Sequence, residues 1–169
     1  MIAYFSRAEE NYGVGVVEKG NTQIVAEMIA EETGGDLFHI QTVITYPDDY
    51  DECTEVAKQE KADNARPELD FKVDNFKDYD VIYLGYPIWW SDMPMAVYTF
   101  LESYDFSDMT VIPFNTHAGS GQAGTVDNIK EICSQATFLD GLVISGADTQ
   151  NEPDNTIEQV VKWVAKIQY

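Results

Sequence analysis

Short apolar runs alternate with segments of helical period along the whole chain, and this alternation limits the folds that it can adopt. The apolar runs cover residues 2–5, 36–41, 81–86, 110–115 and 142–145. Between them, apolar residues recur three and four positions apart, which is typical of helices that bury one face. Five strands that are each followed by a helix predict an α/β fold, a three-layer α/β/α sandwich around a five-stranded parallel sheet.

The helices expected from this period lie near residues 21–33, 48–65, 95–101, 126–133 and 157–164. The second is mostly polar, and we expect Cys53, Val56 and Ala57 to face inward from it. Residues 81–86 (VIYLGY) are the pattern of a central parallel strand that is covered on both faces. No repeat, linker or low-complexity tract interrupts the alternation, so we expect a single domain over residues 1–169.

The charge balance is strongly acidic, with 30 acidic against 10 basic side chains and a formal net charge of −20. Such a surface repels nucleic acid and anionic lipid, and it favours partner proteins with basic faces. The alternative is that the acidity serves solubility alone. The cysteines, Cys53 and Cys133, have no metal-ligand or disulfide spacing, and we see no signal peptide and no apolar run of membrane-spanning length. We therefore expect a cytoplasmic protein without a metal site.

Open α/β sheets bind ligands beyond the carboxyl ends of their strands, so the loops there carry the functional information. After the first strand come Ser6 and Arg7, and the loop ends in Gly20, Asn21 and Thr22 where a helix begins. A helix N-terminus offers unpaired N–H groups to an anion, and hydroxyls add hydrogen bonds. This loop predicts a phosphate site, the alternative being that Asn21 or Thr22 merely caps the helix.

The loop after the third strand contains Pro87, Ile88, Trp89 and Trp90. Aromatic side chains at a strand end suggest a flat ring bound against them, and Pro87 restricts the loop. Adjacent side chains in an extended segment point in opposite directions. We therefore expect one tryptophan in the core and the other on the ring, with Trp89 the better candidate for the ring.

The loop after the fourth strand supplies the remaining candidates. Residues 119–124 (GSGQAG) match a dinucleotide fingerprint, but that motif normally occupies the first strand-to-helix turn, so the match is weak. His117 could couple proton uptake to redox chemistry or orient a hydride acceptor, or it could be a solvated loop residue. His39 lies within a strand and is expected to be structural. The candidate residues of this loop are Asn115, Thr116, His117, Gly119, Ser120 and Gly121.

Three motifs, GNT at 20–22, GYPIWW at 85–90 and THAGSG at 116–121, give the chain a resemblance to the flavodoxins, with residues 8–18 inserted into the phosphate loop. The resemblance implies the strand order 2-1-3-4-5 and non-covalent binding of flavin mononucleotide (FMN). It also implies that the ring is held at its pyrimidine side by the THAGSG segment. The implied FMN-binding residues are Ser6, Arg7, Asn21, Thr22, Pro87, Ile88, Trp89, Trp90, Asn115, Thr116, His117, Gly119, Ser120 and Gly121.

The implied function is a low-potential electron carrier, monomeric or weakly dimeric, that docks on basic faces of redox-partner proteins. The alternative is an FMN-dependent NAD(P)H:quinone-type oxidoreductase, which the small residues of THAGSG favour and the scarcity of basic residues disfavours. A phosphoryl-accepting receiver domain is excluded, because Ser6 and Gly85 stand where that fold needs acidic residues. A non-redox interaction module, which would not bind flavin, stays open.

Overall fold

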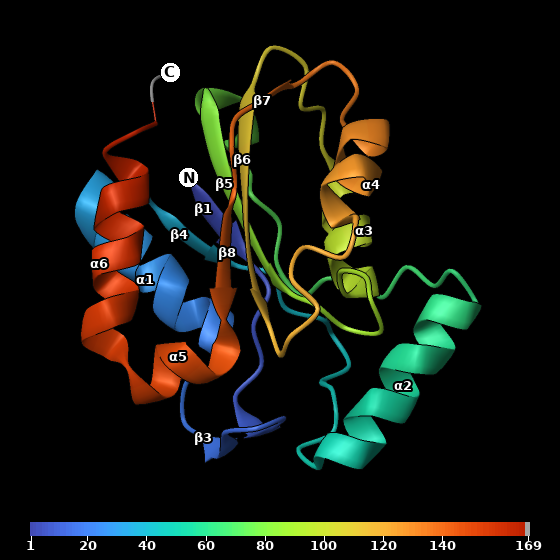
Figure 1. Ribbon diagram of the computed structural model, residues 1–169. Coiled ribbons are helices and arrows are strands. Elements are labelled where there is room, and N and C mark those ends of the chain that lie inside the picture. The colour runs from blue at the N-terminus through green and yellow to red at the C-terminus, as the bar shows by residue number, and fades with distance from the viewer. Residues whose placement is uncertain (168–169) are drawn as a thin grey trace.

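The computed structural model describes residues 1–167 and is built around a parallel sheet (Figure 1). Its strands are β1 (Ile2–Tyr4), β4 (Leu37–His39), β5 (Val81–Pro87), β6 (Thr110–His117), β7 (Thr137–Phe138) and β8 (Leu142–Ser145). The order is β4-β1-β5-β6, and both β7 and β8 pair with β6 in parallel. The predicted order 2-1-3-4-5 is therefore confirmed, with the fifth position shared by two short strands.

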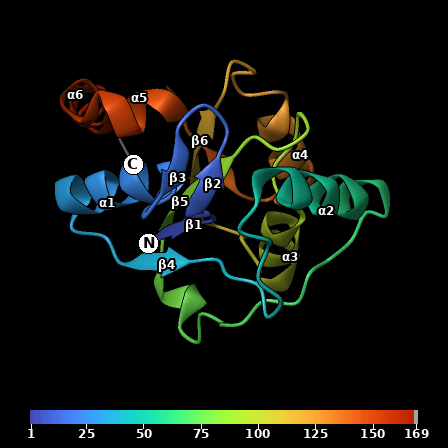
Figure 2. The same ribbon diagram turned by 90° about the horizontal axis from the view of Figure 1, so that it is seen from below.

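Helices cover both faces of the sheet, which confirms the predicted sandwich (Figures 1 and 2). One face carries α1 (Asn21–Thr33), α5 (Gly146–Asn151) and α6 (Pro153–Val164), and the other carries α3 (Met95–Ser103) and α4 (Thr125–Ile132). Two hydrophobic clusters fill the spaces between the layers. Ile2, Ile29 and Val160 belong to the first, and Leu84, Phe100 and Ile129 belong to the second.

The central strand β5 forms where the sequence is apolar throughout. Residues 82–86 are all buried, and the strand pairs with β1 on one side and β6 on the other. Side chains alternate between the two faces, so Tyr83 packs in the first cluster while Leu84 and Tyr86 pack in the second. Gly85 is needed for close packing, because a Cβ there would lie 2.2 Å from the Phe114 ring.

The structure also contains elements that depart from the predicted pattern. The insertion at residues 8–18 forms an antiparallel hairpin of β2 (Glu9–Asn11) and β3 (Gly15–Val17), which lies below the carboxyl ends of the strands in Figure 1. The segment after β8 holds two helices, α5 and α6, where we expected one. A short 3₁₀ helix, η1 (Phe76–Asp78), precedes β5.

The second predicted helix is observed as α2 (Tyr50–Ala62), and it stands away from the sheet beside α3 (Figure 1). Asp49 caps it, accepting a hydrogen bond from the Glu52 N–H at 2.9 Å. Cys53 and Ala57 are buried as predicted, but Val56 is 39% exposed, so the prediction for Val56 is wrong. The physical reason is that α2 covers a loop rather than the sheet, so its buried stripe is narrow.

Within residues 1–167, no helix is both long and apolar enough to span a bilayer. The same residues contain no group of three or more His, Cys, Asp or Glu side chains that is arranged to hold a metal ion.

Candidate functional site

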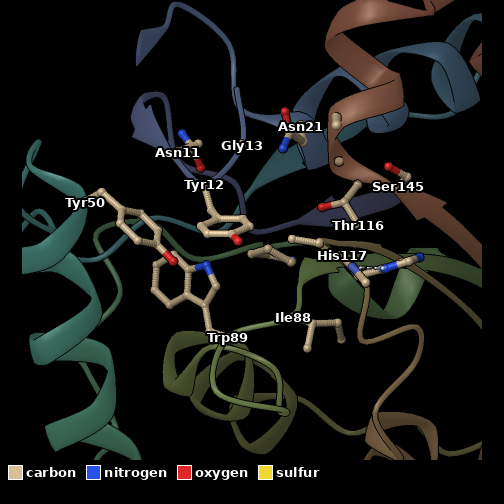
Figure 3. A pocket seen from close by; sticks show the side chains of 15 residues that line it. Asn11, Tyr12, Gly13, Asn21, Tyr50, Ile88, Trp89, Thr116, His117 and Ser145 are labelled. Carbon is tan, nitrogen blue, oxygen red and sulfur yellow. Dashed lines mark hydrogen bonds between the residues drawn. The ribbon is translucent and has the colours of Figure 1, made fainter. Parts of the chain in front are cut away.

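A cavity of about 480 Å³ opens at the carboxyl ends of β5 and β6, where four loops and the hairpin meet (Figure 3). This volume falls in the range of small-molecule sites, roughly 300–1,000 Å³. Tyr12, Tyr50 and Trp89 gather at one end of it, and Thr116, His117 and Ser145 lie at the other. Its walls are made of Asn11, Tyr12, Gly13, Asn21, Tyr50, Pro87, Ile88, Trp89, Thr116, His117, Ala118, Gly119, Ser145, Gly146 and Ala147.

The N-terminus of α1 lies beside this cavity and is not closed by its own residues. Its N-cap is Gly20, which has no side chain to offer, so the alternative that Asn21 or Thr22 merely caps the helix is wrong. Ser6, from the end of β1, instead accepts a hydrogen bond from the Gln23 N–H at 3.0 Å. The N–H groups of Asn21 and Thr22 have no partner within the helix. Together with the macrodipole they form a site suited to an anion.

The residues around this helix end are packed tightly. A Cβ on Gly20 would lie 2.3 Å from both the Arg7 carbonyl oxygen and the Ser6 Oγ. The buried hydroxyls of Thr22 and Thr116 are hydrogen-bonded at 2.8 Å, which ties α1 to the end of β6. A small cavity adjoins this point and is lined by Ser6, Arg7, Asn11, Asn21, Thr22, Pro87, Trp89 and Thr116.

Asn21 is held in place from the far end of the chain. Its Oδ1 accepts a hydrogen bond from Gln150 Nε2 at 2.9 Å, and Gln150 also donates to the Lys19 carbonyl at 2.8 Å. A Cβ on Gly146 would lie 2.5 Å from the Asn21 Nδ2, so a larger residue there would displace the Asn21 side chain. The predicted candidate Asn21 thus lines the main cavity with a fixed side chain.

Arg7 turns its guanidinium toward backbone carbonyls. Its Nε and Nη2 donate to the Pro47 carbonyl at 3.0 and 2.6 Å, and further bonds reach the carbonyls of Glu10 and Asp48. These bonds fasten the hairpin to the loop that precedes α2. Arg7 therefore borders the small cavity but not the main one, and its donors are largely engaged.

Sequence reasoning did not select the hairpin residues that line the cavity, Asn11, Tyr12 and Gly13. The Tyr12 side chain is 65% exposed, and its ring lies 5.9 Å from that of Tyr50. Glu10 ties the hairpin to the first residue of α2, because its Oε2 accepts a hydrogen bond from the Tyr50 N–H at 3.0 Å. The sequence signal for a hairpin was the Tyr12–Gly13 pair within a long insertion. That pair does not indicate which part of the fold the hairpin packs against.

The two tryptophans have different environments. Trp89 lines the cavity and also packs edge-on against Phe5 and Tyr46, with ring centroids 5.2 Å apart in both pairs. Trp90 is 48% exposed, and its Nε1 donates to the Thr54 carbonyl on α2 at 2.9 Å. The expectation that leaves Trp90 as the core tryptophan is therefore wrong, because Trp90 is half exposed. Trp89 packs against the core and also lines the main cavity, which Trp90 does not.

A strained turn directs the side chains of Trp89 and Trp90 to different parts of the structure. Trp90 and Ser91 have φ of +50° and +60°, and the Trp89 and Asp92 backbones exchange hydrogen bonds of 2.8 and 3.0 Å. This is a type I′ turn without its usual glycine or asparagine. Each left-handed residue costs about 1–2 kcal/mol. Asp92 offsets part of this cost, because its Oδ1 accepts bonds from the Met93 N–H at 2.8 Å and from the Tyr98 hydroxyl at 3.0 Å.

The loop after β6 is shaped by hydrogen bonds within it. His117 Nδ1 accepts a bond from the Gly119 N–H at 2.9 Å, and Gly119 has a φ of +107° that favours glycine. Asn115 Nδ2 donates to the Gly121 carbonyl at 3.1 Å. His117 and Gly119 line the main cavity with Thr116, whereas Asn115, Ser120 and Gly121 do not.

His39 lies beside the loop between β1 and α1, which is the phosphate-type loop named for the phosphate site expected there. Its ring stacks on Tyr4 with centroids 4.8 Å apart, and its Nε2 lies 3.1 Å from the Ser6 carbonyl oxygen. Burial lowers the pKa of His39, which favours the neutral ring at physiological pH. This agrees with the structural role expected for it.

Comparison with solved structures identifies the architecture. A candidate flavoprotein from Bacteroides uniformis is 29% identical, with a TM-score of 0.78 over 98% of this chain and 97% of that one. A flavoprotein from Lactobacillus acidophilus, solved in complex with FMN, is 21% identical, with a TM-score of 0.66 over 89% of this chain and 95% of that one. The two-electron reduced flavodoxin of Megasphaera elsdenii is 18% identical, with a TM-score of 0.52 over 96% of this chain and 99% of that one.

No curated protein matches the sequence significantly. A family model described as flavodoxin, in contrast, matches residues 2–166, which is nearly the whole chain. The match includes the phosphate-type loop, the loop of the two tryptophans and the loop of His117. The chain therefore belongs to the flavodoxin family.

Proposed function

We propose that this protein binds FMN non-covalently and carries electrons between redox-partner proteins. The observation that supports the proposal is that two features of the site lie next to each other at one edge of the sheet. An open helix N-terminus suited to a phosphate adjoins a cavity whose far end is aromatic. FMN has a phosphate at one end and a flat ring system at the other, so the donor set and the walls fit it. The same-fold Lactobacillus protein was solved with FMN, which supports this choice.

Each part of the site has a distinct task in this proposal. The N–H groups of Asn21 and Thr22 hold the phosphate, and the Ser6 hydroxyl adds a donor, because its oxygen already accepts from Gln23. Pro87, Ile88 and Trp89 supply the wall on which the ring lies. Thr116, His117 and Gly119 lie along the opposite edge, where the Gly119 N–H is already donated to His117 Nδ1. Asn115 and Gly121 fix this loop through their hydrogen bond, and Ser120 lies in the same loop.

FMN, when bound, supplies one- and two-electron redox chemistry, and the protein sets its environment. The −20 net charge disfavours additional negative charge at the site, which lowers the reduction potential by the logic that raises an acid's pKa beside an anion. The hydrogen bond from the Gly119 N–H occupies His117 Nδ1, so any proton that His117 exchanges passes through its Nε2. The acidic surface also steers the protein toward basic faces of partners.

An anaerobic reductive titration of the FMN-saturated protein tests the carrier role. We expect two resolved one-electron steps in the visible spectrum, because a carrier must hold an intermediate oxidation level. A single two-electron step would instead favour an FMN-dependent NAD(P)H:quinone-type oxidoreductase. That second candidate is supported by the small residues Ala118 and Gly119 in the cavity wall, which leave room for a substrate. No flavin band after FMN is added would exclude both functions.

Replacing each tryptophan in turn separates their contributions to FMN binding. We expect Trp89→Ala to raise the FMN dissociation constant about tenfold or more, since an aromatic contact contributes roughly 0.5–1.5 kcal/mol beyond its buried area. Trp90→Ala should change it less than threefold, because Trp90 does not line the main cavity. Quenching of flavin fluorescence measures both constants. Equal losses in the two variants would contradict the assignment of the ring wall to Trp89.

A further inference from the structure

A second cavity of about 390 Å³ lies between α2 and the segment that carries the two tryptophans. It adjoins the first cavity, because Asn11, Tyr50, Ile88 and Trp89 line both. Figure 3 shows Tyr50 and Trp89 at the same end of the first cavity, and both also line the second. Its remaining walls are Arg7, Cys53, Thr54, Ala57 and Trp90. These five residues lie outside the main cavity and have no task in the FMN site proposed above, although Arg7 also borders the small cavity beside the N-terminus of α1.

The chemistry of these walls is aromatic and nearly uncharged. Tyr50, Trp89 and Trp90 contribute three rings. Burial raises the pKa of the Cys53 thiol, so the sulfur stays protonated and behaves as a small apolar group. Arg7 is the one charged side chain among the described residues of this lining, and its guanidinium is turned toward backbone carbonyls.

Hydrogen bonds fix the Trp90 wall of this cavity. Trp90 is fastened across it by two hydrogen bonds, from its Nε1 to the Thr54 carbonyl at 2.9 Å and from Lys61 Nζ to the Trp90 carbonyl at 2.7 Å. The strained turn at Trp90 and Ser91 aims the indole toward α2 rather than back into the core. Strained residues persist where the surrounding structure fixes them, and they cluster at binding sites.

We propose that this second cavity binds a flat, uncharged aromatic molecule beside the flavin site. We infer a flat ligand because the three rings of the wall favour stacked or edge-on partners. An uncharged ligand follows from the electrostatics, because the −20 net charge repels anions, while Arg7 in the lining and Lys58, whose Nζ lies 5.4 Å from the centroid of the Trp90 ring, repel cations. A ligand there would touch Trp89, which also lines the site proposed for the flavin ring.

The test uses 2-naphthol, which is flat and uncharged at neutral pH, against its saturated analogue decahydro-2-naphthol. Binding to the FMN-saturated, ¹⁵N-labelled protein is followed by the tryptophan indole N–H signals in NMR spectra. We expect saturable shifts of the Trp89 and Trp90 signals and none of Trp163, whose Nε1 donates to the Asp140 carbonyl on the other side of the sheet. The saturated analogue should bind at least tenfold more weakly.

Neighbouring positions on α2 give a matched pair of variants. Ala57→Phe adds a ring inside the cavity and should weaken 2-naphthol binding at least tenfold, whereas Val56→Phe adds it at a different, partly exposed hollow and should change binding less than twofold. If Ala57→Phe does not fold, the wild-type indole shifts and the comparison of the two ligands decide. Absent binding, shifts at Trp163, equal affinity of the two ligands, or equal behaviour of the two variants would overturn the proposal. Trp90 lines the second cavity and not the first, so its shift reports on the second cavity with or without FMN, and a failure of FMN to bind remains a separate result.

Discussion

Replacing Gly20 by alanine should raise the FMN dissociation constant roughly 100-fold, which corresponds to about 2.8 kcal/mol. The added methyl would lie 2.3 Å from the Arg7 carbonyl oxygen and 2.8 Å from its carbonyl carbon, and backbone atoms cannot rotate away as a side chain can. The φ of −67° at Gly20 is allowed for alanine, so the effect is steric rather than conformational. The segment of Ser6 and Arg7 must therefore shift away from the N-terminus of α1, which disrupts the proposed phosphate site.

Gly34→Ala, at the opposite end of α1, is the control for this variant. It also adds one methyl, but into open space at a φ of +69°. It should lower stability by about 1 kcal/mol and leave FMN affinity within twofold. Titration by flavin fluorescence quenching compares the two. A Gly20→Ala protein that keeps FMN affinity within threefold of the original would show that the phosphate is bound elsewhere.

Replacing Gly85 by alanine should lower the free energy of unfolding by about 3 kcal/mol. The new methyl would lie 2.2–2.8 Å from three atoms of the Phe114 ring, and Phe114, only 1% exposed, has nowhere to move. Gly85 and Phe114 are paired residues of β5 and β6, so the strain falls at the centre of the sheet. For a chain of this length, the midpoint of thermal unfolding should fall by about 6–12 °C.

A second substitution identifies the cause. In the double variant Gly85→Ala with Phe114→Leu, the smaller side chain gives the methyl room, so the combined loss should be smaller than the sum of the single losses. Gly35→Ala provides the control, because its methyl would meet the end of the Ile2 side chain, which can rotate. Additive losses in the double variant would contradict the steric explanation. Urea or thermal unfolding gives all four values.

The sheet could be predicted from the sequence because burial imposes a pattern on it. Residues 81–86 read as a central strand since both faces of β5 are covered, and the other strands and most helices followed from the alternation. The hairpin could not be predicted. Its strands are three residues each, and they contain charged and glycine residues that no core requires. The polar helix α5 was missed for the same reason.

The site was predictable in position but not in every side chain. Loop ends such as Asn21 and Thr116 follow from strand topology, because the carboxyl ends of parallel strands meet at one edge. The direction of the Trp90 side chain could not be predicted, because it depends on a left-handed turn at Trp90 and Ser91. Tryptophan and serine rarely adopt that conformation. The position of Tyr12 in the cavity wall could not be predicted either. The insertion is held by hydrogen bonds to residues far along the chain, such as Asp48 and Tyr50.

The position of α2 has a consequence for how ligands come and go. Only Cys53 and Ala57 of its thirteen residues are buried, and its other attachments are mostly polar, such as the hydrogen bond from Tyr46 to Glu60 at 2.8 Å and the ion pair of Lys61 with Asp92 at 3.6 Å. Elements with few buried apolar contacts open at a lower free energy than the global unfolding of the domain. We therefore expect α2 to detach as a local unit while the sheet stays folded. Such fluctuations would make it the gate that sets the rate of ligand exchange, so that ligand release need not await unfolding of the core.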